Sequence, residues 1–406
     1  GKYESERAMT ETMRLSVPLN ALRAFEAAAR HMSIKDAAEE IGIPKTDDFN
    51  AGNNEGSGYF DVTQKRGVRW SAARAFLKPV LSRPNLSVMT KATVVGLEIE
   101  GAIARGVTYQ RGGKTKTVRA NREVILSAGV IGTPQILKLS GIGPGAELCD
   151  HGITVKHDLP GVGENLQDHL QLRMVFRISG AKTLNDCARG LLGKAGIALE
   201  YALRRSGPMS MAPSQLGIFA KSSEAFETAN IEYHVQPLSL DRFGEPLHDF
   251  PGLTVSVCNL RPESAGAVHV TSNDPGAAPA IAPRYLSAPA DRQVAVDSLR
   301  HARRLMATAR MSAFQPQELK PGPDLTSDAD LIRAAGDVGT TIFHPVGTTK
   351  MGTDPMAVVD PELRVHGIGG LRVVDAGIMP TIVSGNTHAP VTMIAEKAAR
   401  MILPSP

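Results

Sequence analysis

The sequence predicts an α/β (α+β) fold in which a domain with a mixed or antiparallel sheet is inserted into another domain. Short β-rich runs fill the middle of the chain, from about residue 171 to residue 281. On either side, short apolar strands alternate with amphipathic helices, as at 123–139 and 371–402. A sheet-rich middle between two α/β-like ends is the pattern expected when one domain is inserted into another.

The composition is that of an ordinary globular protein with two or three domains. Of 406 residues, 42% are hydrophobic and 21% are charged, and the formal net charge is +4. The basic residues are scattered, which argues against specific nucleic-acid binding. Three widely spaced cysteines indicate neither a metal site nor a disulfide framework and suit a reducing compartment. No apolar run is long enough for a transmembrane segment and no signal peptide is evident, so a cytoplasmic location is predicted.

Local patterns predict several individual elements. Apolar residues at helical spacing predict two helices over 19–41, and the polar, glycine-rich segment 45–58 is expected to be a loop. Runs flanking Gly112-Gly113 predict a β-hairpin of 106–109 and 115–120. Further helices are predicted over 71–81, 133–139, 191–203, 291–308 and 391–402, and strands over 85–99, 123–126, 172–178, 231–235, 253–260, 267–271 and 371–374.

The strongest chemical signal is a histidine between an aromatic residue and a proline, in the segment FHPVGTTKMG at 343–352. This setting fixes the imidazole of His344 on a loop. An imidazole titrates near neutral pH and suits proton transfer. The alternative is a histidine that only caps a turn, and this stretch alone does not decide between the two.

A second signal is the segment SGNTHAP at 384–390, which leads into the last helix. Asn386 or Thr387 could cap that helix, and a helix N-terminus is a good site for an anion or a polarised oxygen. His388 is either a second proton-handling group or a loop histidine bonded to the backbone. Between the two signals, an apolar strand ends at Asp375 and Ala376. Ligand contacts in α/β folds lie at such strand ends.

These three stretches, in this order and spacing, resemble the carboxyl-terminal signature of the glucose-methanol-choline (GMC) oxidoreductases, with its HPxGTxxMG, RVVDxSxMP and GNxHxP elements. The segments 67–77, 123–143 and 159–169 (LPGVGENLQDH) resemble other elements of the same family. The resemblance covers roughly residues 43–406. Two positions depart from the family pattern: Val130 stands where a small residue is preferred, and Gly377 stands where serine is common.

The resemblance implies a flavoenzyme that oxidises a primary alcohol to an aldehyde by hydride transfer to flavin N5. His344 matches the catalytic base, and His388 matches the residue that helps to hold the substrate oxygen. The positions that match residues near FAD are Val94, Asp375, Ala376, Asn386 and Thr387.

The family architecture further implies a domain division and leaves the electron acceptor open. Segments 43–170 and 340–406 match a partial FAD-binding domain, and 171–339 matches the substrate-binding domain. Overall similarity to bacterial alcohol and choline dehydrogenases favours a quinone or carrier over dioxygen as the electron acceptor.

One expected element of the family is missing from the sequence. The family begins with a strand–turn–helix unit whose GxGxxG turn holds the FAD pyrophosphate. The nearest string here is Gly141–Ala146, which follows a predicted helix instead of a strand and contains Pro144. We therefore expect an N-terminally truncated, incomplete FAD-binding domain that holds FAD weakly. The alternative function is an inactive, non-catalytic remnant or fusion product that does not bind FAD.

The segment 14–43 resembles the opening of LysR-type transcription regulators, with their first helix and the first half of a helix-turn-helix. A recognition helix should follow, but the sequence from Pro44 to Asn54 is already GMC-like. Without that helix, residues 1–42 are predicted to be a helical segment with no specific DNA binding. The alternative is that 20–30 is merely an alanine-rich amphipathic helix.

Overall fold

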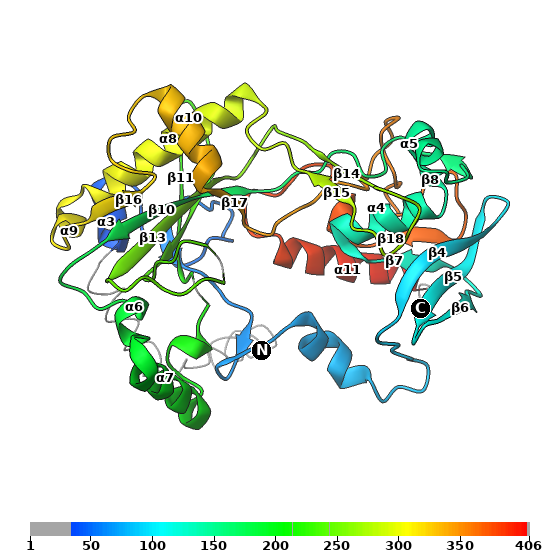
Figure 1. Cartoon of the computed structure of the whole chain (residues 1–406), viewed down its shortest axis with the longest axis horizontal. Coiled ribbons are helices and arrows are strands. Elements are labelled where there is room, and N and C mark those ends of the chain that lie inside the picture. Colours follow the sequence, from blue (N-terminus) through cyan, green and yellow to red (C-terminus); the bar gives the residue numbers. More distant parts are fainter. Residues whose placement is uncertain (1–33, 213, 243, 404–406) are drawn as a thin grey trace, which may run out of the picture. The chain divides into compact units, whose positions relative to one another are not determined.

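The computed structural model describes residues 34–212, 214–242 and 244–403, and the chain divides into two compact units (Figure 1). Unit 1 contains the residues up to Leu86, Leu172–Val257 and Ser298–Val338, and unit 2 contains Ser87–Gln171, Cys258–Asp297 and Gly339–Pro406. Each unit is therefore assembled from three separate stretches of sequence. The predicted mixed α/β fold is confirmed. The assignment of FAD-binding and substrate-binding roles to particular segments stays a prediction.

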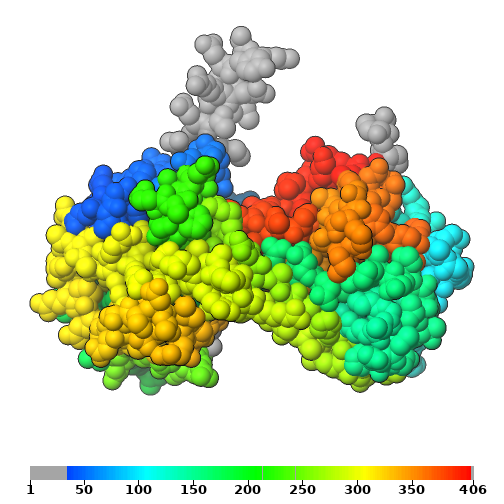
Figure 2. Space-filling model, turned by 90° about the horizontal axis from the view of Figure 1, so that it is seen from above, coloured from blue at the N-terminus to red at the C-terminus, as the bar shows by residue number. Residues whose placement is uncertain are grey.

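A large sheet dominates unit 1. Its strands run in the order β1 (Gly56–Tyr59), β11 (Leu216–Ala220), β12 (Ile231–Gln236), β13 (Gly252–Asn259), β10 (Leu170–Arg177) and β16 (Gln317–Lys320). The pairs β1–β11, β11–β12 and β10–β16 are antiparallel. The sequence predicts an antiparallel sheet here, but it does not predict the individual strands β1, β11 and β16. In Figure 2 the helices α9 (Ala309–Ser312) and α10 (Asp328–Val338) lie within the yellow and orange surface of this unit.

The structure corrects two predictions, one about a loop near the start of the chain and one about a strand in its middle. The expected loop over 45–58 ends early, because β1 begins at Gly56 and pairs with β11. Gly58 permits this pairing, since a Cβ there would lie 2.6 Å from the carbonyl oxygen of Thr46. The strand near 267–271, expected in the large sheet, is β14 (Ala267–His269) and pairs instead with β15 (Ala280–Ala282) in unit 2. There it packs against helix α4 (Gly129–Leu139).

The helices predicted in the segments 19–81 and 191–308 are confirmed only in part. Helix α3 spans Ile34–Glu40, and the earlier residues of the predicted 19–41 helices lie outside the described residues. The predicted helix 71–81 is two short turns, Ala73–Leu77 and Lys78–Val80, because Pro79 has no N–H to continue a regular ladder. The insert is α6 (Leu184–Cys187) and α7 (Gly190–Arg204), and a further predicted helix is α8 (Pro289–Met306).

Unit 2 contains the predicted hairpin. Strands β5 (Ile103–Arg111) and β6 (Lys114–Arg119) are antiparallel, and Arg111 lies opposite Lys114. The two-residue turn uses Gly112 and Gly113 at φ values of 57° and 73°, which glycine adopts at little cost. Strand β4 (Thr93–Glu100) pairs with β5, so the strand predicted over 85–99 begins later than expected.

A parallel pair of strands forms the centre of unit 2. Strand β7 (Val124–Leu126) lies beside β18 (Leu371–Val373), with Leu371 opposite Val124. Helix α4 follows β7, and helix α11 (His388–Ile402) contributes Ile394 to the same hydrophobic core as Val373. The core therefore holds together the end of β18 and helix α11, next to which most of the candidate site residues lie. Among the described residues, no helix is both long and apolar enough to cross a bilayer.

Candidate active site

Asp168 is the centre of a buried group of hydrogen bonds in unit 2. One carboxylate oxygen, Oδ1, accepts the backbone N–H of His344 at 2.9 Å. The other, Oδ2, accepts the hydroxyls of Tyr285 and Thr341, each at 2.5 Å. Burial, together with the Asp168 charge, raises the pKa of Tyr285, so its phenol remains a donor. Three donors from two segments, Thr341 and His344 on one and Tyr285 on the other, thus converge on one carboxylate and fix the backbone at His344.

The imidazole of His344 contacts a second, buried imidazole. Nδ1 of His344 lies 3.1 Å from Nδ1 of His169, and the two rings are inclined at 80°. His169 is fully buried, and its Nε2 lies 3.1 Å from the carbonyl oxygen of Leu260. His344 is half-buried. The His169 ring therefore connects the partly accessible imidazole of His344 to the buried carbonyl group of Leu260.

The backbone beside His344 has a conformation that is costly for most residues. Phe343 has φ of 63°, in the left-handed region, and its side chain is 69% exposed. Such a conformation costs roughly 1–2 kcal/mol and persists where surrounding contacts hold it. Here the hydroxyl of Thr341 accepts the N–H of Phe343 at 2.9 Å. Val346 and Gln167 exchange two backbone hydrogen bonds, at 2.8 and 3.1 Å, on the other side of His344.

Asp375 lies where β18 meets the start of α4. Its Oδ2 accepts the N–H of Gly129 at 2.9 Å and the hydroxyl of Thr133 at 2.6 Å, and its Oδ1 accepts the N–H of Gly377 at 2.8 Å. Burial raises the pKa of Asp375, against the opposing effect of these hydrogen bonds. A carboxylate at a helix N-terminus also meets the positive end of the helix dipole. The helix predicted from residue 133 begins at Gly129, where Asp375 holds its first N–H group.

The loop that follows His344 runs along the residues that follow Asp375. Gly347 donates its N–H to the carbonyl of Ala376 at 3.3 Å, and Thr349 donates to the carbonyl of Gly377 at 2.9 Å. Gly377 has no room for the serine common in the family, because a Cβ there would lie 2.4 Å from Thr349 Oγ1. Two of the motifs singled out in the sequence are therefore adjacent in the structure.

The other predicted residues lie at the N-terminus of α11 and at the start of β4. Asn386 and His388 are exposed, whereas Thr387 is buried. Thr387 occupies the capping position of α11, but its side chain makes no capping hydrogen bond, so that part of the prediction is wrong. Val94 is half-buried in β4, opposite Tyr109. All seven predicted site residues belong to unit 2, while the roles that the family resemblance implies for His344 and His388 stay predictions.

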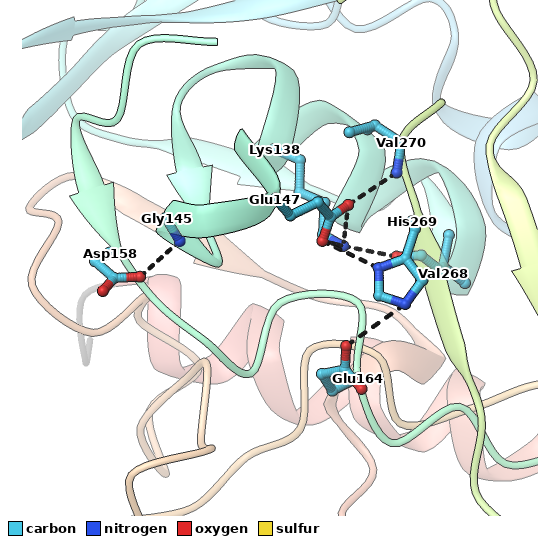
Figure 3. A network of polar contacts seen from close by, with 8 residues as sticks. All are labelled: Lys138, Gly145, Glu147, Asp158, Glu164, Val268, His269 and Val270. Carbon is cyan, nitrogen blue, oxygen red and sulfur yellow. Dashed lines mark hydrogen bonds and ion pairs between the residues drawn. The ribbon is translucent and has the colours of Figure 1, made fainter. Parts of the chain in front are cut away.

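The glycine string at Gly141–Ala146 serves internal packing. Ile142–Gly143 forms β8, which pairs with β9 (His157–Asp158), and α5 (Gly145–Asp150) follows. Asp158 Oδ1 accepts the N–H of Gly145 at 2.9 Å (Figure 3). The helix end that a phosphate would need is therefore occupied by a carboxylate of the chain itself.

Next to this string lies a buried ion pair that no sequence motif indicates (Figure 3). The Lys138 ammonium is fully buried and donates to both carboxylate oxygens of Glu147, at 2.9 and 2.7 Å, and to the carbonyl of Val268 at 2.8 Å. Burial lowers the pKa of Lys138. Burial acts to raise the pKa of Glu147, but hydrogen bonds from Lys138 and His269 outweigh it and the pKa is lowered. Because the ammonium has three acceptors, its role is to hold α4, α5 and β14 together.

The described part of the chain contains no cluster of three or more histidine, cysteine, aspartate or glutamate side chains that could hold a metal ion. The functional residues missed from the sequence are Asp168, His169 and Tyr285. A signal for two of them was present, since Asp168 and His169 end the family-like stretch 159–169. Tyr285 lies in no motif, and only the fold brings it to Asp168.

Comparisons with known proteins define the class. Models of the N- and C-terminal parts of the GMC oxidoreductases match residues 4–171 and 262–395. An alcohol dehydrogenase [acceptor] of Pseudomonas putida is 40% identical over 377 residues, which are 91% of this chain and 68% of that protein. An oxygen-dependent choline dehydrogenase of Photobacterium profundum is 40% identical over 91% of this chain and 65% of that protein. The chain belongs to the GMC oxidoreductase family and spans about two thirds of the length of these relatives.

Solved structures of oxidases also resemble this chain. A pyridoxine 4-oxidase from Mesorbium loti has a TM-score of 0.80 and 28% identity, over 92% of this chain and 69% of that chain. A formate oxidase from Aspergillus oryzae, described with its FAD modification, has a TM-score of 0.84 and 28% identity, over 93% and 70%. FAD-dependent alcohol oxidation fits these findings, and none of them favours the non-catalytic alternative. The N-terminal family match covers residues 14–43, and the resemblance of that segment to LysR regulators is unconfirmed.

Proposed function

We propose that this protein oxidises a primary alcohol to an aldehyde, with FAD as the hydride acceptor and His344 as the base. The observation that carries the proposal is the placement of the His344 imidazole, 3.1 Å from His169 and on a backbone fixed by Asp168. The relatives named as alcohol and choline dehydrogenases support the reaction class. Bound FAD supplies a two-electron acceptor for hydride.

His344 suits the removal of the hydroxyl proton for three reasons. Its ring is half-buried, so a small alcohol has access to it while bulk water is partly excluded. Its backbone N–H is fixed by the Asp168 carboxylate. An imidazole within hydrogen-bond reach of a hydroxyl can act as a general base, an effect worth roughly 10²- to 10⁴-fold in rate. Taking this proton makes departure of the α-hydride easier.

The residues around α11 and β18 fit a flavin. The positive end of the 15-residue helix α11 carries the exposed side chains of Asn386 and His388, a setting suited to a polarised ring or substrate oxygen. Ala376 is small and half-buried, so it leaves room for the edge of a flat ring. Asp375 fixes the backbone beside it through three accepted hydrogen bonds. Val94 offers backbone groups for the adenine, and Thr387 is buried at the foot of the helix.

For the electron acceptor we propose a quinone or a carrier in preference to dioxygen. One similar relative is named an alcohol dehydrogenase [acceptor], although the choline dehydrogenases are named oxygen-dependent. The two alternatives differ in one measurable rate. After reduction by an alcohol, the protein should be reoxidised faster by a soluble quinone than by air-saturated buffer. Faster reoxidation by dioxygen would identify an oxidase.

The test of the proposed reaction is anaerobic flavin reduction. The full chain is saturated with FAD and mixed with a panel of straight-chain, aromatic and quaternary-ammonium primary alcohols. We expect loss of the oxidised-flavin absorbance with at least one alcohol and formation of the corresponding aldehyde in equal amount. A matched tertiary alcohol, which has no α-hydrogen to transfer, controls for non-specific bleaching. Persistent oxidised flavin with every primary alcohol would contradict the proposal.

A further inference from the structure

We infer that His169 is a positioning residue that fixes the tautomer of His344. The carbonyl of Leu260 in turn fixes the tautomer of His169, because it accepts a hydrogen bond from that ring. The inference rests on the proposed role of His344 as the base and adds a reason why one particular nitrogen takes the proton. The tautomer of His344 follows from the hydrogen positions on three nitrogen atoms in turn: Nε2 of His169, Nδ1 of His344 and Nε2 of His344.

The first assignment comes from the Leu260 carbonyl. A carbonyl oxygen can only accept a hydrogen bond, so the group 3.1 Å away, Nε2 of His169, must carry the hydrogen. Leu260 directly follows β13 and is fully buried, so this acceptor is held by the regular backbone of a strand end. The orientation of the His169 ring is therefore determined.

The second assignment concerns the contact between the two rings. His169 is fully buried, and burying a charged ring is costly, so the neutral form is favoured. A neutral imidazole with hydrogen on Nε2 has its lone pair on Nδ1. The Nδ1–Nδ1 separation of 3.1 Å is a hydrogen-bond distance, and the 80° inclination excludes ring stacking. Nδ1 of His344 must therefore be the donor.

The third assignment concerns the nitrogen that meets the substrate. Neutral His344 with hydrogen on Nδ1 carries its lone pair on Nε2, so Nε2 is the atom that takes the alcohol proton. The alternative tautomer would present an N–H group to the alcohol and could not act as a base. After proton uptake both nitrogens are donors, and the Nδ1 bond to His169 persists unchanged. Asp168 contributes separately, because it fixes the backbone N–H of His344 and not the ring.

The decisive measurement reads the tautomers directly and needs no turnover. The full chain is labelled with ¹⁵N-histidine, and two-bond ¹H–¹⁵N correlations distinguish hydrogen-bearing from lone-pair nitrogens. His344 signals are assigned by their loss in His344→Gln. In the wild-type protein above the range of imidazole protonation, we expect hydrogen on Nδ1 of His344 and on Nε2 of His169. Hydrogen on Nε2 of His344 would overturn the inference, even if no variant of His169 folds.

Two substitutions of His169 provide a matched pair. His169→Gln retains an oxygen that can accept from His344 and an amide that can donate to Leu260, whereas His169→Leu retains neither. We expect His344 in His169→Leu to show a mixture of tautomers, and we expect His169→Gln to keep hydrogen on Nδ1. An unchanged His344 tautomer in His169→Leu would overturn the inference.

The rates separate failure of this inference from failure of the proposed function. We expect His169→Leu to lower kcat for flavin reduction about 10- to 100-fold with little change in KM, the size of effect seen when a metal-ligating histidine loses its orienting partner. His169→Gln should recover most of that rate. A shifted tautomer in His169→Leu with an unchanged rate would leave the tautomer assignment standing and contradict the role of His344 as the base.

Discussion

The carboxylate of Asp375 accepts the N–H group of Gly129, the first residue of helix α4, at 2.9 Å. The two residues are 246 positions apart in the sequence, and their contact ties the end of β18 to the start of α4. Gly377 and Thr133 add two further donors to the same carboxylate. The Asp375 carboxylate thus fixes the backbone that carries Ala376. The sequence motif around Asp375 does not reveal this structural role.

Replacing this carboxylate should therefore destabilise unit 2. In Asp375→Ala two backbone N–H groups and one hydroxyl lose their buried acceptor, and an unsatisfied buried donor costs roughly 1–3 kcal/mol. We expect a loss of about 2–4 kcal/mol in the free energy of unfolding, measured by urea titration with circular dichroism. Asp354→Ala is the control, because Asp354 is an exposed partner of Lys350, and solvent screening should leave stability nearly unchanged. Equal effects of both substitutions would contradict the assigned role.

The Lys138–Glu147 pair predicts a specific pattern of single and double substitutions. Lys138→Met removes the buried ammonium but leaves Glu147 in the interior, with a side chain only 14% exposed. Breaking a buried pair in this way typically costs about 3–5 kcal/mol. The double substitution Lys138→Met, Glu147→Gln removes both charges and keeps an acceptor for the N–H of Val270, so its loss should be smaller. A double variant less stable than Lys138→Met would show that charge compensation is not the reason for the pair.

A buried histidine in unit 1 predicts a defined pH dependence of stability. A hydrogen bond of 2.7 Å joins the Tyr233 hydroxyl to Nδ1 of His301, and burial, with a contribution from the charge of Arg304, lowers the pKa of His301 to about 4. The usual value for histidine in an unfolded chain is about 6.5. Between these values the unfolded chain binds a proton that the folded chain does not. Stability is therefore lost as the pH falls from about 6.5 to about 4, by roughly 3 kcal/mol in total.

The substitution His301→Gln tests this assignment. Glutamine retains an acceptor for the Tyr233 hydroxyl but does not titrate, so the stability of the variant should depend less on pH within this window. Thermal unfolding between pH 4 and pH 7 compares the two proteins, with the half-buried His151→Gln as a matched control that keeps the wild-type slope. The same pH dependence in wild type and His301→Gln would mean that another group is responsible.

The elements predicted well are those specified by local chemistry. The β5–β6 hairpin follows from Gly112-Gly113 between alternating strands, and α7, α8 and α11 follow from apolar residues at helical spacing. The beginnings of elements were harder to predict. Helix α4 begins at Gly129 because of a carboxylate 246 positions away, and β1 exists because β11 provides a partner for a glycine-rich segment. Neither cause is visible within a local window of sequence.

The same distinction applies to the candidate site. His344, Asp375 and His388 lie in motifs that can be recognised from the sequence, and the first two are on adjacent loops in the structure. The partners that explain their chemistry come from elsewhere in the chain. Asp168 and His169 precede His344 by about 175 residues, and Tyr285 lies in a segment without any motif. The candidate site residues can thus be recognised from local sequence motifs. Their tautomers and buried hydrogen-bond partners depend on contacts between distant parts of the chain.

The most direct test of the central claim is the rate of anaerobic flavin reduction in FAD-saturated wild type and His344→Ala, mixed with the best primary alcohol in a stopped-flow instrument. We expect a rate lower by roughly 10²- to 10⁴-fold in His344→Ala, because the base that takes the hydroxyl proton is removed. His151→Ala, a substitution at the carboxyl end of α5, should retain the wild-type rate. Equal rates in His344→Ala and wild type, with equal FAD occupancy, would contradict the assignment of His344 as the base.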